Sequence, residues 1–323
     1  MTDFHVEAVR VRNVQKHPNA DTLSIADAGG YPVIFQTGTY NDGDLAAYVP
    51  VDAVVPDSPE WAFLGGNRRI KAKRLRGIFS MGLLTKAPDG ANEGDDLAEA
   101  LGVVKYEPAE HGGKVSVGTN EAGPIGWDFV KYTDIEPLRR WSNVIGPGVD
   151  VVLTEKIHGA NARYCHDGER LWVGSRTQIK RHDGENTWSH VATQLDLETK
   201  LASAPRMIFF GEVFGNVQDL KYGIASGATF RCFDVFSVDS MRYLNHEVAR
   251  WAAQAVGVEW VPELYRGPWV EELRSFADGS STLASHVREG FVVKPLEEIH
   301  HGRLGRVILK HVGEGYLLRK GAK

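Results

Sequence analysis

Cysteine is scarce in this chain, which holds only two, Cys165 and Cys232, far apart and without a C-x-x-C partner. Neither a disulfide framework nor a cysteine zinc site is therefore expected, and both thiols should be buried and reduced. The chain also lacks an apolar run of the ~18 residues that a membrane-spanning helix needs, and its first residues lack the basic and apolar regions of a secretory signal. These absences predict a cytoplasmic protein without a membrane partner.

Several motifs with known chemistry are also missing. The sequence has no G-x-G-x-x-G, G-x-x-x-x-G-K-[ST], G-x-S-x-G or H-E-x-x-H pattern. The usual signs of dinucleotide binding, P-loop phosphate binding, α/β-hydrolase chemistry and helical zinc proteases are thus absent. What is present is a composition of 42% hydrophobic and 24% charged residues, typical of a globular chain. Its 323 residues should form roughly two domains, each with its own core.

The hydrophobic pattern divides the chain into three parts. Residues 1–106 contain short β segments separated by turns, which predicts a small β barrel or sandwich with one helical segment at 94–101. Residues 107–124 are rich in Gly, Glu, Ser and Pro and should form a linker. Residues 125–323 hold more strand patterns than helical ones, which predicts an α+β domain with largely antiparallel sheets and flanking helices.

A net charge of −5 hides a local concentration of positive charge in the first part. Half of the 12 lysines and arginines in residues 1–118 lie in one segment: Arg68, Arg69, Lys71, Lys73, Arg74 and Arg76. In a strand, Arg69, Lys71 and Lys73 would share one face and the other three the opposite face. One such face could bind RNA phosphates. The alternative is a solvated or edge strand whose charges only prevent aggregation.

The segment T-E-K-I-H-G-A-N at 154–161 follows an apolar strand. A lysine at the end of a buried strand is costly unless it is paired or reactive, and its amine becomes nucleophilic when burial or nearby cations lower its pKa. Lys156 is therefore the candidate nucleophile. K-x-H-G alone has many chance matches, so its weight depends on the segments that follow it.

Five more segments combine strand patterns with charged residues. They are G-S-R-T at 174–177, F-G-E-V-F-G at 210–215, F-R-C-F-D-V-F at 230–236, E-G-F-V-V-K at 289–294 and V-I-L-K at 307–310. In order and spacing the set resembles motifs I, Ia, III, IIIa, IV and V of the covalent nucleotidyltransferases, which include DNA ligases, RNA ligases and mRNA capping enzymes. The resemblance covers about residues 150–312. Taken singly, Glu212 would more often be an ordinary strand-end carboxylate and Phe233 a core residue.

Details of the motifs resemble the RNA ligases in particular. K-x-H-G-x-N and the S-R pair at 175–176 are similar to RNA ligases, whereas DNA ligases and capping enzymes favour K-x-D-G. The stretch H-P-N-A-D-T-L at 17–23 is similar to OB-type tRNA-binding modules. An OB-like domain ahead of the transferase resembles one RNA ligase family that seals nicks with RNA on the 3′-hydroxyl side. DNA ligases and capping enzymes would place an OB domain after Lys310.

The resemblance implies an ATP-dependent RNA ligase that charges Lys156 with AMP, transfers the AMP to a 5′-phosphate and joins that end to a 3′-hydroxyl. Lys294 and Lys310 would supply cations to the phosphates and lower the pKa of Lys156 by repulsion. Glu289 and Glu212, with Asn161 partly through water, would hold Mg²⁺ or Mn²⁺. The implied nucleotide-binding positions are Glu155, Lys156, Ile157, His158, Asn161, Arg176, Glu212, Phe233, Glu289, Lys294 and Lys310.

The remaining implied roles concern the nucleotide and the RNA. Phe233 would stack on adenine, His158 would meet the sugar and Arg176 would lie near the RNA terminus. The basic segment at 68–76 would grip the strand that supplies the 3′-hydroxyl, in RNA or in a nicked duplex that contains RNA. No obligate protein partner is indicated.

Motif V departs from the family pattern. RNA ligases generally present K-x-K there, but Ile308 stands in place of the first lysine, so Arg306 or His311 would have to compensate. Two alternatives stay open: a DNA ligase or capping-type nucleotidyltransferase, and a nucleic-acid-binding homologue that has lost activity. Only Ile308 favours the second alternative.

Overall fold

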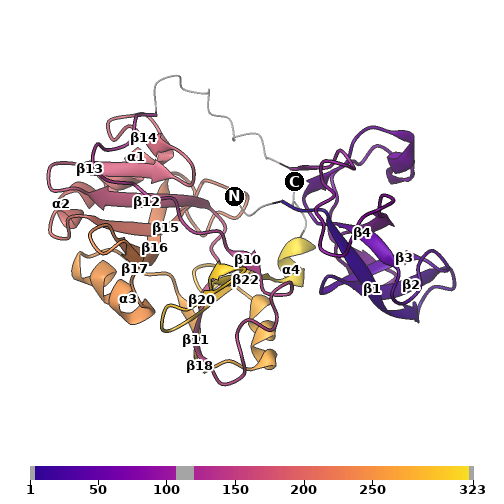
Figure 1. Cartoon of the computed structure of the whole chain (residues 1–323). Helices are drawn as coiled ribbons and strands as arrows, with labels where there is room; N and C mark the ends of the chain where they lie inside the picture. Colours follow the sequence, from indigo (N-terminus) through magenta and orange to yellow (C-terminus); the bar gives the residue numbers. More distant parts are fainter. Residues whose placement is uncertain (1–3, 107–119, 320–323) are drawn as a thin grey trace. The chain divides into compact units, whose positions relative to one another are not determined.

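The computed structural model describes residues 4–106 and 120–319, which form two compact units (Figure 1). The first holds the N-terminal region together with Pro137–Trp141, and the second holds most of residues 120–316. Most of the predicted linker, residues 107–119, lies outside the described residues.

The N-terminal unit is built on one antiparallel sheet with the strand order β3-β2-β1-β4-β8. Its strands are β1 (Glu7–Lys16), β2 (Leu23–Ala28), β3 (Tyr31–Gln36), β4 (Leu45–Val49) and β8 (Leu83–Lys86). Smaller elements are the pairs β5 (Ala53–Val54) with β9 (Val104–Lys105) and β6 (Lys73–Leu75) with β7 (Ile78–Ser80), and the 3-10 helix η1 (Pro59–Leu64). Alternate residues of β1 and β4 enter two separate hydrophobic clusters, as the two-residue period of a strand requires.

The helix predicted at residues 94–101 is wrong, because this segment is made of turns and a bridge between Glu7 and Asp96. The Asp96 carboxylate accepts hydrogen bonds from the amides of Val6 (3.1 Å) and Ala98 (3.1 Å). Aspartate side chains that bind nearby backbone groups compete with the helix for those groups. Here the competition holds the segment against β1 and buries Leu97.

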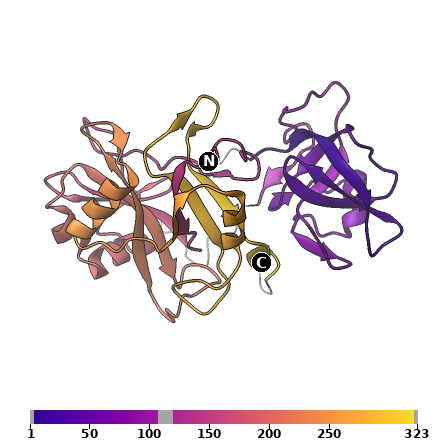
Figure 2. The same cartoon turned by 90° about the horizontal axis from the view of Figure 1, so that it is seen from below.

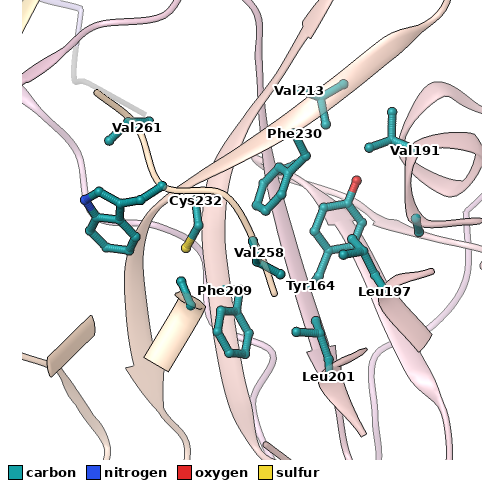
Figure 3. Packing of buried hydrophobic residues seen from close by; sticks show 14 of the residues in the cluster. Tyr164, Val191, Leu197, Leu201, Phe209, Val213, Phe230, Cys232, Val258 and Val261 are labelled. Atoms are coloured by element: carbon teal, nitrogen blue, oxygen red, sulfur yellow. The ribbon is translucent and has the colours of Figure 1, made fainter. Parts of the chain in front are cut away.

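The second unit contains a six-stranded antiparallel sheet in the order β14-β13-β12-β15-β16-β17. The strands are β12 (Ala160–His166), β13 (Leu171–Ser175), β14 (Ile179–Lys180), β15 (Met207–Gly215), β16 (Ala228–Ser237) and β17 (Arg242–Tyr243). Helices α1 (Thr187–Gln194), α2 (Leu197–Leu201) and α3 (His246–Ala255) share one hydrophobic cluster with this sheet. Figure 3 shows this packing, with Tyr164 and Phe230 beside Val191 and Leu197 of the helices.

A second antiparallel sheet of this unit has the order β10-β22-β19-β11-β18. Its C-terminal strands are drawn in gold in Figure 2. Its strands are β10 (Glu136–Pro137), β11 (Asp150–Glu155), β18 (Glu263–Pro268), β19 (Gly290–Pro295) and β22 (Leu309–Val312). The remaining elements are the pair β20 (His300–His301) and β21 (Gly305–Arg306), the 3-10 helix η2 (Glu271–Ala277) and α4 (Glu314–Leu317). Val292 and Ile308 pack into a cluster with Phe210 and Phe236 of the six-stranded sheet, so the two sheets share a core.

This arrangement confirms the predicted α+β class with antiparallel sheets and flanking helices. In the part of the chain that the structure describes, every helix is too short or too polar to cross a lipid bilayer.

Candidate active site

Lys156 directly follows strand β11, and its amide donates a hydrogen bond to the carbonyl oxygen of Gly290 on the neighbouring strand (3.0 Å). Its Nζ donates to Oε1 of Glu289 at 2.6 Å. Burial alone would lower the pKa of Lys156, but the carboxylates of Glu289 and Glu212 outweigh burial and raise it. Lys156 is therefore an ammonium in the free protein, held against a carboxylate that belongs to the same candidate site.

Glu289 lies immediately before β19 and is 8% exposed. Burial would raise its pKa, but the positive charge of Lys156 outweighs burial and lowers the pKa to about 2. Gly290 lets β19 pair closely with β22. Its φ is +153°, and a Cβ there would lie 2.0 Å from the carbonyl oxygen of His311. The backbone thus presents an ionised carboxylate at the point where β11 and β19 meet.

Asn161 and Glu212 face each other on the paired strands β12 and β15. Burial raises the pKa of Glu212 to about 8, although the positive charge of Lys156 opposes this shift. Gly159 lets the two segments approach, because a Cβ there would lie 2.3 Å from the carbonyl oxygen of Val213. Asn161 Oδ1 and Glu289 Oε2 are both buried and have no hydrogen-bond partner within the described residues. One amide oxygen and one carboxylate oxygen without partners, together with the carboxyl group of Glu212, are the ligand types that a hard divalent cation prefers.

Lys310 completes this group from β22, where it pairs in register with Val292 of β19. Burial lowers its pKa to about 8, and repulsion from Lys156 adds to the effect. Lys156, Glu212, Glu289 and Lys310 thus influence one another electrostatically, as the sequence motifs predict.

Lys294 corrects the sequence interpretation. Its Nζ contacts Asp234 Oδ1 at 3.1 Å, and it belongs to a buried cluster with Arg306 and Tyr132. Arg306 also contacts Asp234 (2.6 Å) and Glu298 (2.5 Å). Lys294 was expected to lower the pKa of Lys156, but the pKa of Lys156 is raised and that of Lys294 is itself lowered by burial. A buried ammonium needs a local counterion, and Asp234 is that counterion.

The departure in motif V has a structural explanation. Ile308 is 2% exposed and packs in the core between the two sheets, so its position does not lead into the site. Arg306 is committed to Asp234 and Glu298. His311 is buried and its ring stacks on Phe291.

Two predicted nucleotide contacts turn away from the group around Lys156. Glu155 Oε1 accepts a hydrogen bond from the Ser281 hydroxyl (2.5 Å), and its Oε2 accepts from the amide (2.8 Å) and hydroxyl (2.5 Å) of Thr282. Ile157 is 4% exposed and packs in the cluster under the helices. Both side chains anchor the loop that carries Lys156.

Arg176 and Phe233 come from two different strands of the six-stranded sheet. Arg176 follows β13, pairs with Asp134 and contributes to the electrostatics of Lys156. Phe233 is the extra residue of a β-bulge in β16, because Phe210 pairs with Asp234 while Gly211 pairs with Cys232. Bulges redirect a side chain. The Phe233 ring lies 4.9 Å from that of Tyr132 and packs against both hydrophobic clusters of the unit.

The basic segment of the N-terminal unit is not one continuous strand. Ile70 and Ala72 are buried, so Arg69, Lys71 and Lys73 alternate with core residues. The prediction that Arg68, Arg74 and Arg76 form a second basic face is wrong. Ile70 and Ala72 lie between Arg68 and Arg74 on that face, and both are buried. Only Lys73–Leu75 forms a strand, β6, and Arg76 has a left-handed backbone in the turn to β7. Arg69 contacts Asp52 at 2.7 Å and lies over the Tyr106 ring.

Several residues of the site escaped sequence reasoning. Asp234 is an acidic residue in an otherwise largely apolar strand segment, and such a residue can be recognised from the sequence as a candidate buried charge. Asp219, Tyr222 and Tyr316 surround His158, but they come from a loop and from α4, and no spacing links them to the motifs.

A separate group of His246, Glu247 and Glu263 has the spacing of metal ligands. Glu263, however, already accepts hydrogen bonds from His246 (2.8 Å), Arg250 (2.8 Å) and Arg266 (2.8 Å). These contacts outweigh burial and lower its pKa to about 2. Two guanidinium groups neutralise this carboxylate, which leaves no net negative charge for a cation.

Comparisons with known proteins place the chain in a family. A family model described as RNA ligase matches residues 149–312, and an OB-fold domain model matches residues 6–87. No curated protein matches the sequence.

Solved structures of Naegleria gruberi RNA ligase share the fold. A variant of that protein with ATP and manganese has a TM-score of 0.80 at 21% identity, covering 96% of this chain and 97% of that one. The same protein with pyrophosphate has a TM-score of 0.81 at 23% identity, covering 97% and 98%. Because the family model spans half of the sequence, the chain belongs to the RNA ligase family.

Proposed function

We propose that this chain is an ATP-dependent RNA ligase that joins a 3′-hydroxyl RNA end to a 5′-phosphate end, at nicks in duplexes, through a lysyl-AMP on Lys156. The observation that carries the proposal is the position of the Lys156 amine, which lies 2.6 Å from Glu289 and interacts electrostatically with Glu212 and Lys310. A cytoplasmic location remains part of the proposal.

Glu289, Asn161 and Glu212 would hold Mg²⁺ or Mn²⁺, directly or through water. The orphaned oxygens of Asn161 and Glu289 support this assignment, and the neighbouring RNA ligase structures are with manganese. A divalent cation supplies positive charge that offsets the charge developing on phosphate oxygens. Glu289 can pair either with the Lys156 ammonium or with this cation. In the second case it no longer raises the pKa of the amine.

In the first step, the Lys156 ammonium loses a proton to water. The lone pair of Nζ then forms a bond to the α-phosphorus of ATP, while the bond from that phosphorus to the bridging oxygen breaks and pyrophosphate leaves. Lys310 has a pKa of about 8, so it is protonated once phosphate charge lies beside it and can stabilise that charge. The AMP then passes to the 5′-phosphate of RNA, and the 3′-hydroxyl displaces it. Phe233, His158 and Arg176 are proposed to contact adenine, sugar and the RNA terminus.

The test is covalent labelling with α-labelled ATP or GTP and Mg²⁺ or Mn²⁺. We expect label from ATP that survives denaturation and a +AMP adduct on Lys156 by mass spectrometry. Lys156→Ala should abolish the label, and Lys86→Ala, a change at an 83% exposed lysine, should leave it unchanged. Labelling from GTP alone would favour the capping-type alternative. Absence of label from either nucleotide would favour the inactive nucleic-acid-binding homologue.

A further inference from the structure

We propose that Asp219 is a positioning residue of nucleotidyl transfer, which orients the His158 imidazole so that its Nδ1 faces Tyr316 and Glu289. This inference rests on the proposed function. It assigns a task to a loop residue outside all the sequence motifs.

The contact between Asp219 and His158 is short and directional. Asp219 Oδ1 lies 2.6 Å from Nε2 of His158. A carboxylate only accepts hydrogen bonds, so Nε2 carries the proton. In the neutral ring Nδ1 is then the acceptor, and the Tyr316 hydroxyl lies 2.9 Å from it, in position to donate. The same Nδ1 lies 3.5 Å from Oε2 of Glu289. Asp219 thus selects the tautomer that the Tyr316 contact requires.

The loop between β15 and β16 is held against the Lys156 segment at three points. Besides the Asp219 contact, the His158 amide donates to the Tyr222 hydroxyl (2.7 Å), and Gln218 Nε2 donates to the carbonyl oxygen of Gly159 (3.4 Å). The Tyr222 ring is 6% exposed and packs edge-on against Phe214 at 5.1 Å. Three contacts along one short segment fix where the Asp219 carboxylate lies, which is what a positioning residue needs.

The consequence reaches the nucleophile through Glu289. Glu289 bonds the Lys156 ammonium through Oε1 and faces the His158 ring through Oε2. If the His158 ring rotated, Glu289 Oε2 would have a different neighbour at the moment when Lys156 separates from Glu289. Losing an orienting partner of this kind typically costs 10–100-fold in rate while the reacting groups stay in place.

The test measures single-turnover formation of the lysyl-AMP as a function of ATP concentration. We expect Asp219→Ala and Asp219→Asn to lower the maximal rate about 10–100-fold, with the half-saturating ATP concentration within about threefold of wild type. Asp219→Glu should recover part of the rate. Asp183→Asn removes the same charge at an exposed ion pair with Arg181 and should have no effect.

A double-mutant cycle separates positioning from general damage. If Asp219 acts through His158, then adding Asp219→Ala to His158→Ala should slow the reaction no further. Histidine ¹⁵N NMR gives a second readout: the signal lost in His158→Gln should show the Nε2–H tautomer in wild type and lose it in Asp219→Ala. Additive rate losses, or an unchanged tautomer, would overturn the inference. A wild-type protein that never forms lysyl-AMP would instead refute the proposed function, and the tautomer would still test Asp219.

Discussion

Two groups of charged residues in the second unit differ in how completely their polar atoms have hydrogen-bond or ion-pair partners. Around Asp234, the carboxylate has Lys294, Arg306 and Tyr132 as partners, and these contacts hold its pKa below the ordinary 3.8 although burial would raise it. Around Lys156, Asn161 Oδ1 and Glu289 Oε2 have no hydrogen-bond partner within the described residues, and burial raises the pKa of Glu212 to about 8. A saturated group stabilises one structure, whereas an unsaturated group can exchange partners during a reaction.

The largest expected effect breaks the saturated group. Asp234→Ala would leave Lys294 and Arg306 buried without their shared counterion, which should lower the free energy of unfolding by about 3–5 kcal/mol. Urea unfolding measures the change. Asp239→Ala removes an aspartate from an exposed pair with Arg206 and should cost less than about 1 kcal/mol. Equal losses in the two variants would contradict the contrast between the groups.

The next effect concerns the group that exchanges partners. Glu289→Gln should slow lysyl-AMP formation by about 10²–10³-fold, because a charge that acts in the transition state is lost. It should also make Lys156 more reactive toward a neutral acylating reagent at pH 8, since Glu289 no longer raises the pKa of the amine. Mass spectrometry of Lys156, with Lys86 as the reference lysine, measures reactivity. Slower labelling together with slower acylation would argue against the assigned role of Glu289.

The pH dependence of stability should separate Asp234 from Glu212, because their pKa values shift in opposite directions. Asp234 contributes stability above its ordinary pKa that is lost as the pH falls below 3.8. Glu212 contributes stability below 4.5 that is lost as the pH rises through about 8. The stability of Glu212→Gln should therefore increase relative to wild type as the pH rises from 4.5 to about 8, by at most about 1.4 kcal/mol per pH unit. If the free energies of unfolding of the two proteins changed equally with pH over this range, the raised pKa of Glu212 would be excluded.

The smallest effect concerns the basic segment of the N-terminal unit. Lys71→Glu with Lys73→Glu should weaken sealing of nicked duplexes about tenfold at low salt, because phosphate contacts are lost, and should leave lysyl-AMP formation unchanged. Lys86→Glu with Lys105→Glu makes the same change of charge elsewhere in the unit and serves as the control. If nick sealing and lysyl-AMP formation slowed equally, the basic segment would not act only through RNA binding.

The Lys156 segment shows how much of the site the sequence could predict. The motifs identify Lys156, Glu212, Glu289 and Lys310. These residues converge because each lies in a strand or directly next to the end of one, and the strands pair with fixed register. Lys294 belongs to the same kind of pattern, yet its partner is Asp234. The partner of a buried charge depends on which side chain lies across from it in space, and motif spacing does not contain that information.

The local pattern of hydrophobic and charged residues was enough to predict the α+β class, and the order of the motifs was enough to indicate the RNA ligase family, because strand alternation and motif order are properties of the chain itself. Tertiary structure alone decided that residues 94–101 form turns, that Ile70 and Ala72 interrupt the basic face, and that Asp219 reaches His158. Each of these outcomes depends on contacts between residues distant in sequence, whose free energy exceeds the local preference of the segment.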